Sequence, residues 1–289
     1  MPVMRMETMH IVMAIPAHHK WKVYQMDVKS MFLNGVLKEE VYVAQLLGYK
    51  VEGQEDKVYR SRKSLYGLKQ APHASYNMID AYLLDNGFEK CCGEPTLYIK
   101  ESDDKILIVV LYVDDLTFIG TDNFLIVDFK KVMKNEFEMI DLGLLRYFLG
   151  IEVKQTENGI FISQAKYVAE ILERFKMQNN KYAPTPTIMG LKLSKEYCSD
   201  NANLTLYKSM IDSMMYLTAT RPNIMYAVSL VSRFMETPKE THWQATKRIL
   251  RYDNGTKKYG ILYKATSDFR LFGYTDNDWA RSVDDKRST

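Results

Sequence analysis

The sequence predicts an α+β fold in which strands and helices are combined first, helices follow, and a strand comes last. The strongest evidence is a pair of apolar segments, ILIVVLYV and LTFIG, separated only by Asp114-Asp115. Two apolar strands joined by so tight a turn are typical of a buried β-hairpin. After Gly159 the apolar residues recur with the period of helices instead. We therefore expect the sheet in the first half to carry the buried hairpin, and the second half to be mainly helical.

The first half contains three further elements. Residues 3–15 carry methionines at helical spacing, which predicts a helix that Pro16 ends. Residues 22–28 alternate as a strand does. A helix is expected over residues 73–84, and the Asn86-Gly87 pair is a typical end for it.

The second half shows three helical patterns and then returns to strands. Residues 167–175 place apolar side chains on one helical face, and Pro222 stands at the expected start of the next helix. Residues 237–240 (TPKE) combine a capping box with proline at the first helical position, which predicts a third helix. From Tyr259 onward the pattern is that of strands.

Composition excludes several classes of protein. Hydrophobic residues make up 46% and charged residues 26% of the 289 residues, which is the balance of a globular domain. The longest apolar run, Ile106–Val113, is far shorter than the roughly 20 residues of a membrane span. No basic segment leads into an apolar signal sequence, and three cysteines cannot form a disulfide framework. We therefore expect an intracellular protein, cytoplasmic or nuclear, that is not secreted and has no membrane partner.

Charge is distributed unevenly along the chain. Residues 1–155 carry 19 Lys and Arg against 22 Asp and Glu, a net charge of −3. Residues 156–289 carry 20 against 14, a net charge of +6, and the two sum to +3. This asymmetry favours an acidic site beside a surface that binds a polyanion. An ordinary solvated surface would give the same counts.

Three aspartates form the most informative pattern. Asp114 and Asp115 stand at the mouth of the predicted hairpin, where adjacent carboxylates repel each other unless a cation neutralises them. Aspartate is also a common turn former, so the pair alone leaves both interpretations open. Asp27 adds a third carboxylate at the end of the strand over residues 22–28, on the same face as Gln25. Strand-borne carboxylates of this kind are what two Mg²⁺ ions in a phosphoryl-transfer centre require.

Six segments then support a resemblance to a known family. They are QMDVKSMFLNGVLKEEVYV, KSLYGLKQAP, LYVDDL, YFLGIEV, SMMYLTATRPNIMYAVSLVSRF and GYTDNDWA. Together and in this order, the chain resembles the reverse transcriptase of copia-type LTR retrotransposons over nearly its whole length. The resemblance implies a right-hand polymerase palm with residual fingers over residues 1–155. It also implies a helical thumb-like or connection region over 156–257 and a truncated start of an RNase H domain over 258–289.

The resemblance also implies an RNA-directed DNA polymerase and roles for individual residues. Asp27, Asp114 and Asp115 would be catalytic and would bind two Mg²⁺ ions, or Mn²⁺ in their place, with the backbone carbonyl of Val28 as a further ligand. Contacts to the nucleotide and template are implied at Phe32, Gly67, Lys69, Gln70 and Pro72, and contacts to the nucleic-acid backbone at Lys247, Arg248 and Arg251. The implied partners are an RNA template, a DNA primer, the RNA/DNA hybrid, dNTPs and the remainder of a Pol polyprotein.

Two more positions follow from the same resemblance. Residues 147–153 resemble the family's primer-grip hairpin, which contacts the primer strand. Asp276 matches the first metal-binding carboxylate of the RNase H domain. Because the other acidic ligands of that domain lie further downstream in the family, we expect no RNase H activity.

The chain departs from the family pattern at several positions. His73 and Ser75 stand where the family usually has arginine and tryptophan, and Asp253 stands where it favours an apolar residue. Only 26 residues precede Asp27, fewer than the family's fingers would need. These departures favour a truncated and degenerate copy of the enzyme. The alternative is a catalytically inactive fragment that at most binds nucleic acid.

Overall fold

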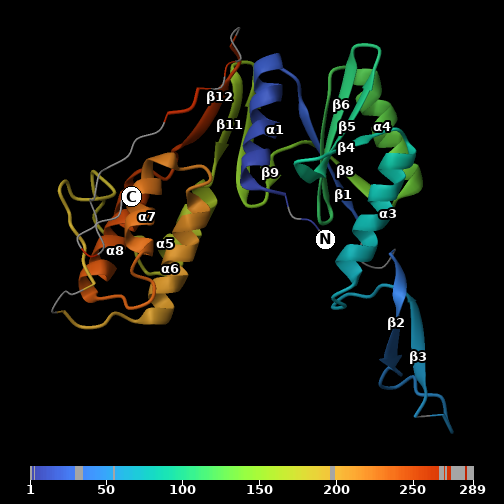
Figure 1. Cartoon of the computed structure of the whole chain (residues 1–289), viewed down its shortest axis with the longest axis horizontal. Coiled ribbons are helices and arrows are strands. Elements are labelled where there is room, and N and C mark those ends of the chain that lie inside the picture. The colour runs from blue at the N-terminus through green and yellow to red at the C-terminus, as the bar shows by residue number, and fades with distance from the viewer. Residues whose placement is uncertain are drawn as a thin grey trace. The chain divides into compact units, whose positions relative to one another are not determined.

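A computed structural model describes residues 2, 4–29, 35–54, 56–195, 199–266, 270, 272–274 and 284. The chain divides into two compact units, Met1–Leu145 and Arg146–Thr289, whose elements are labelled in Figure 1. Each unit combines helices with antiparallel strands, as the predicted α+β class requires. Within the described ranges, no helix is both long enough and apolar enough to cross a membrane.

The first unit is built on a six-stranded antiparallel sheet with the strand order β4-β5-β6-β7-β1-β8. A separate ribbon of two strands, β2 and β3, lies between β1 and α3 in the sequence. The elements are α1 (Met6–His19), β1 (Val23–Val28), β2 (Val36–Ala44), β3 (Val58–Lys63), α3 (Ala71–Asp85), β4 (Glu89–Cys91), β5 (Glu94–Ser102), β6 (Lys105–Tyr112), β7 (Asp115–Gly120), α4 (Asn123–Glu136) and β8 (Met139–Leu144).

The strand register assigns side chains to the two faces of this sheet. Directly opposed residues share a face, and neighbours along a strand alternate between faces. Met26 lies opposite Leu116, and both belong to a buried core that includes Ile79 of α3 and Phe129 of α4. Figure 1 accordingly shows α3 and α4 on one side of the sheet and α1 on the other. Asp27, which follows Met26, therefore lies on the face that α3 and α4 do not cover.

Helix α1 continues through Pro16, so the predicted end at this residue was wrong. Proline lacks a backbone donor, but residue 16 lies in the last turn of α1, where only one internal hydrogen bond is lost. The helix ends at His19, and the next residue, Lys20, has a left-handed φ of +59°. The N–H of Trp21 then donates to the Pro16 carbonyl at 2.9 Å and closes the end.

Glu94 of β5 caps the beginning of α1 from across the unit. Its Oε2 accepts hydrogen bonds from the Arg5 backbone N–H at 3.1 Å and from the Thr8 hydroxyl at 2.8 Å. Its Oε1 accepts from the hydroxyl and the backbone N–H of Thr96. Burial alone would raise the pKa of Glu94, but these hydrogen bonds outweigh it and hold the pKa below its usual 4.5. The ionised carboxylate therefore fastens α1 to the sheet.

We expect Glu94→Gln to destabilise the chain by about 2 kcal/mol at neutral pH, because hydrogen bonds to a charged acceptor are lost. The pKa of Glu94 is lower in the folded than in the unfolded chain, so its contribution is present above the unfolded value and disappears as the pH falls. Urea unfolding should therefore show a difference in the free energy of unfolding between wild type and variant at pH 7, and this difference should shrink near pH 3.5. Glu101→Gln, at an exposed position of the same strand, is the matched control. Equal stabilities at pH 7 would contradict the capping role.

The second unit combines a four-stranded antiparallel sheet, ordered β12-β11-β10-β9, with a layer of helices. Strands β9, β10 and β11 are consecutive in sequence, and β12, which follows the helices, pairs with β11. The elements are β9 (Tyr147–Phe148), β10 (Ile151–Thr156), β11 (Gly159–Ser163), α5 (Ala165–Arg174), α6 (Leu204–Leu217), α7 (Pro222–Ser232), α8 (Glu240–Gly255) and β12 (Gly260–Lys264).

The helices of this unit enclose the second hydrophobic core. The apolar face predicted over residues 167–175 is confirmed, since Val168, Ile171 and Leu172 are buried in α5. The start of α7 at Pro222 is confirmed as well.

The predicted capping box over residues 237–240 was wrong. Helix α8 begins at Glu240, because the preceding residues pair in extended form with residues 200–202. The cap is made instead by His242, whose Nδ1 accepts the Lys239 backbone N–H at 3.0 Å.

An ion pair joins the ends of two helices inside this core. Arg221, just before α7, and Asp253, in the last turn of α8, are almost wholly buried, and Nη2 of Arg221 lies 2.9 Å from Oδ1 of Asp253. The guanidinium also donates to the carbonyl and hydroxyl of Thr256. Burial raises the pKa of Asp253 to about 7, although the positive charge of Arg221 acts in the opposite direction. The acidic residue that departs from the family pattern therefore has a specific partner.

Candidate functional site

The predicted hairpin brings the three aspartates together. β6 and β7 pair over their length, and the turn between them consists of Val113 and Asp114. β7 then pairs with β1 so that Asp27 lies directly opposite Asp115. The Val28 N–H donates to the Asp114 carbonyl at 3.0 Å, which ties the turn to the end of β1. One sheet end thus carries all three carboxylates, two of them on the face that α3 and α4 leave uncovered.

Burial and neighbouring negative charge raise the pKa of two carboxylates at this end. Burial and then the negative charge of Asp114 raise the pKa of Asp27. Burial also raises the pKa of Asp115, and the charges of Asp114 and Asp27 add to this effect. A hydrogen bond from Gln25 works the other way at Asp115 but does not reverse the shift. The cluster therefore carries a surplus of negative charge that a bound cation would relieve.

Gln25 is a part of the site whose role the sequence did not reveal. Its Nε2 donates to Oδ1 of Asp115 at 2.6 Å, and the side chain is buried. Thr117 lies opposite Gln25 in the register and is also buried. Its hydroxyl has no hydrogen-bond partner among the described residues. The signal in the sequence was the period-two spacing of Gln25 and Asp27, which placed both on one face without showing which residue Gln25 contacts.

The turn that carries Asp114 has an unusual backbone. Val113 has a φ of +54°, in the left-handed region. A β-branched residue rarely adopts this conformation, and residues held in it cost about 1–3 kcal/mol. Such residues concentrate at functional sites, where the surrounding structure holds them in place. Here the pairing of β6 with β7 and the bond from Val28 fix the turn.

The donor set at this end is suited to magnesium in its chemistry. Carboxylate and carbonyl oxygens are the ligands that this cation prefers. Across the ranges that the structure describes, however, no three His, Cys, Asp or Glu side chains are gathered as a ready-made metal site. The three aspartates are neighbours on the sheet, and a cation would have to draw their side chains closer together.

Four of the predicted nucleotide and template contacts lie where the chain enters α3. Gly67 and Lys69 are exposed, and Gly67 has a φ of +87° in open space. Gln70 is the residue before α3, and Pro72 occupies the first turn of that helix. This segment precedes a helix rather than belonging to the sheet that carries the aspartates. Two further predicted site residues, Phe32 and Asp276, lie outside the described residues.

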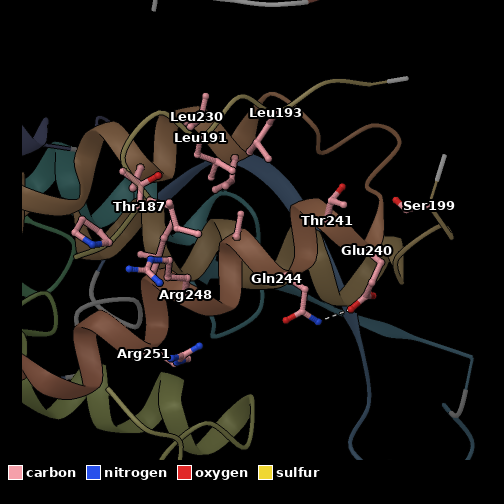
Figure 2. Close-up of a pocket in the computed structure, with 16 residues that line it drawn as sticks. Thr187, Leu191, Leu193, Ser199, Leu230, Glu240, Thr241, Gln244, Arg248 and Arg251 are labelled. Carbon is pink, nitrogen blue, oxygen red and sulfur yellow. Dashed lines mark hydrogen bonds between the residues drawn. The ribbon is translucent and has the colours of Figure 1, made fainter. Parts of the chain in front are cut away.

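Two of the three predicted basic residues of α8 are engaged with a loop of the second unit. Arg248 donates to the Thr185 hydroxyl at 3.0 Å, and Arg251 donates to the Lys181 carbonyl at 2.8 Å. Figure 2 shows both guanidinium groups beside a largely apolar pocket of about 540 Å³ between α7, α8 and this loop. Lys247 lies 5.0 Å from the ring centroid of Trp243. Part of each arginine is thus committed to holding the loop.

Comparison with known proteins adds evidence that covers the whole chain. It is 39% identical to the retrovirus-related Pol polyprotein from transposon TNT 1-94 of Nicotiana tabacum, over all of this chain and 22% of that protein. It is 37% identical to the corresponding polyprotein from transposon RE1 of Arabidopsis thaliana, over all of this chain and 20% of that protein. The chain therefore spans about a fifth of the length of these relatives.

The putative transposon Ty5-1 protein of Saccharomyces cerevisiae is 32% identical over 87% of this chain and 82% of its own length. No solved structure matches the chain. Residues 1–189, which include the three aspartates, match the family described as reverse transcriptase (RNA-dependent DNA polymerase). The chain thus belongs to the reverse transcriptase family, in the form found in copia-type Pol polyproteins.

Proposed function

We propose that the chain is an RNA-directed DNA polymerase whose catalytic residues are Asp27, Asp114 and Asp115. The observation that carries this proposal is the register of β1 and β7, which places Asp27 opposite Asp115 and binds the Asp114 turn to Val28. In this assignment the first unit supplies a palm, with the ribbon of β2 and β3 as fingers. The helices of the second unit act as a thumb, and residues from 258 onward begin an RNase H domain.

The three carboxylates, with the backbone carbonyl of Val28, would hold two Mg²⁺ ions, or Mn²⁺ in their place. Such ions, when bound, stabilise negative charge on the attacking and leaving oxygens of a phosphoryl transfer. The chain's own part is to keep the carboxylate oxygens in position. The strands fix the backbone of Asp27 and Asp115, and Gln25 holds one oxygen of Asp115. Residues on strands are held more rigidly than residues on loops.

Substrate binding is assigned to two other regions. Contacts to the nucleotide and the template base would be made by Phe32, Gly67, Lys69, Gln70 and Pro72. Lys247, Arg248 and Arg251 would contact phosphates of the RNA/DNA hybrid through the N–H groups that the loop leaves available.

Primer extension tests the polymerase directly. The full chain is incubated with an RNA template, a DNA primer, dNTPs and Mg²⁺, beside the same reaction with a chelator and beside Asp114→Asn. We expect extension only with wild type and free Mg²⁺. If wild type shows the circular dichroism of a folded protein and still extends no primer, the proposal is wrong.

A second function, binding of nucleic acid without catalysis, is favoured by the net charge of +6 in residues 156–289. Affinity for an RNA/DNA hybrid, measured across salt concentrations with and without Mg²⁺, separates the two. Phosphate contacts give a linear loss of log affinity with log salt. Binding alone would be supported if the chain extends no primer and if Mg²⁺ does not change the slope of log affinity against log salt concentration.

A further inference from the structure

The second unit contains a pocket of about 540 Å³ between α7, α8 and the loop over residues 186–193 (Figure 2). Val231 of α7 and Ile249 of α8 line it and belong to the second hydrophobic core. Leu230 and Ala245 line it as well, but these side chains are only partly buried. Pockets of this volume with mainly apolar walls are typical of sites for small molecules. The pocket thus offers a ligand apolar surface that the protein itself leaves partly uncovered.

Hydrogen bonds on both sides of this loop attach it to α8. Before the loop, the Ala183 N–H donates to the Arg251 carbonyl at 3.2 Å, and the Arg251 side chain donates to the Lys181 carbonyl. After the loop, Nε2 of His242 donates to the Ser194 carbonyl at 3.0 Å, because Nδ1 of this buried ring already accepts a backbone N–H. Since both ends are attached, the pocket exists before a ligand arrives, which lowers the entropic cost of binding.

Two arginines bring positive charge to the wall of the pocket. Arg248 and Arg251 both line it. Their hydrogen bonds go to uncharged oxygens of Thr185 and Lys181. In the part of the chain that the structure describes, no carboxylate forms an ion pair with either guanidinium. Nε of Arg248 is buried and has no hydrogen-bond partner among these residues, so part of this charge is removed from water without compensation. An anion in the pocket would supply the missing counter-charge.

The acidic side chain of the pocket lies away from this basic end. Glu240 is in the first turn of α8, and its Oε1 accepts a hydrogen bond from Gln244 at 2.5 Å (Figure 2). Eight residues separate Glu240 from Arg248, which is about 12 Å along a helix. The pocket therefore has a basic end, at which a negatively charged group of a ligand is favoured.

We propose that this pocket binds a small amphipathic carboxylic acid. Its carboxylate accepts hydrogen bonds from N–H groups of Arg248 and Arg251 that the loop leaves available, and charge-assisted bonds of this kind are strong. Its hydrocarbon chain packs against Leu191, Leu230 and Ala245. A nucleoside triphosphate does not match these walls, because apolar side chains would leave its hydroxyls and phosphates unpaired. The proposal is independent of polymerase activity, since all the lining residues belong to the second unit.

Isothermal titration calorimetry of the full chain with octanoate tests the proposal, and octanol is the uncharged control of the same length. We expect octanoate to bind saturably at one site with a negative heat-capacity change, the mark of apolar burial. Octanol should bind at least about tenfold more weakly, because it cannot form charge-assisted hydrogen bonds. A heat of octanoate addition that does not saturate would overturn the proposal. Octanol binding as tightly as octanoate would overturn it as well.

Substitutions in α8 place the ligand in this pocket. Arg248→Gln removes a charge from the wall, and Ala245→Leu fills part of the apolar space. Each should weaken octanoate binding at least about tenfold. Lys247→Gln is the matched control, because it removes a positive charge from the same helix at a residue outside the pocket lining. Its affinity for octanoate should equal that of wild type, and an equal loss in Lys247→Gln and Arg248→Gln would exclude this site.

Thr185→Val separates recognition of the ligand from attachment of the loop. It removes the hydroxyl to which Arg248 donates and leaves the guanidinium in place. Octanoate should bind this variant as tightly as wild type. If Thr185→Val loses as much affinity as Arg248→Gln, the arginine acts only through the loop and the proposal is wrong. The comparison of octanoate with octanol needs no variant, so it decides the question even if Arg248→Gln does not fold.

Discussion

Asp115→Asn is expected to reduce primer extension by about a thousandfold while leaving the fold at least as stable as in wild type. The loss follows because metal-assisted charge stabilisation is worth several kcal/mol, and each 1.4 kcal/mol changes the rate about tenfold. Stability should be retained because the substitution removes one of three mutually repelling charges from a partly buried position. The Gln25 amide can still donate to the oxygen of an asparagine. Primer extension should therefore fall, while the melting temperature stays the same or rises.

The chain contains its own control for this experiment. Asp103 and Asp104 form a second pair of adjacent aspartates, in the turn between β5 and β6 at the other end of β6. Both are exposed. Asp103→Asn should leave extension and melting temperature close to those of wild type. If Asp115→Asn lowers the melting temperature by several degrees, or if it extends primers normally, the assignment of this carboxylate to catalysis is wrong.

Asp253→Leu is expected to destabilise the second unit by about 3–5 kcal/mol, which makes it the largest structural effect we predict. Removing the carboxylate leaves the guanidinium of Arg221 buried without its counter-charge. The bonds that Arg221 makes to Thr256 do not replace a negative charge. Urea unfolding of the full chain, with Trp21 and Trp279 replaced by phenylalanine so that the fluorescence is that of Trp243 in α8, should report the loss of stability in this unit.

A double substitution distinguishes charge from packing as the cause. Replacing a buried ion pair by apolar residues on both sides is often neutral. Arg221→Met combined with Asp253→Leu should therefore be more stable than Asp253→Leu alone. If the two single effects simply add, the pair is not energetically coupled and the explanation by buried charge fails.

The local part of the site could be predicted from the sequence. Apolar strands on either side of Asp114-Asp115 specified the hairpin, and the spacing in residues 22–28 specified the strand that carries Asp27. These predictions succeeded because period and turn length are properties of short segments. The position of α5 and the start of α7 at Pro222 were predictable for the same reason.

The pairings between distant segments could not be predicted in this way. The register that puts Asp27 opposite Asp115 joins residues 88 positions apart. Arg221 and Asp253 likewise meet only in the folded unit, so an acidic residue in an apolar pattern suggested degeneration where the structure shows a partner. The predicted start of α8 was wrong for a related reason, because pairing with residues 200–202 delays it. The predicted end of α1 was wrong for a local reason, because the last turn of the helix tolerates Pro16.

The left-handed turn at Val113 has a consequence for engineering. Methods that raise thermostability by residue preference would select glycine there, since glycine relieves an unfavourable backbone angle. The same change would give the loop beside Asp114 more conformational freedom, at the point where β1 and β7 hold the carboxylates. Libraries screened only for heat resistance would therefore enrich variants that are more thermostable but extend primers more slowly. Selection for primer extension at high temperature would instead retain Val113, and the stabilising substitutions would occur elsewhere in the fold.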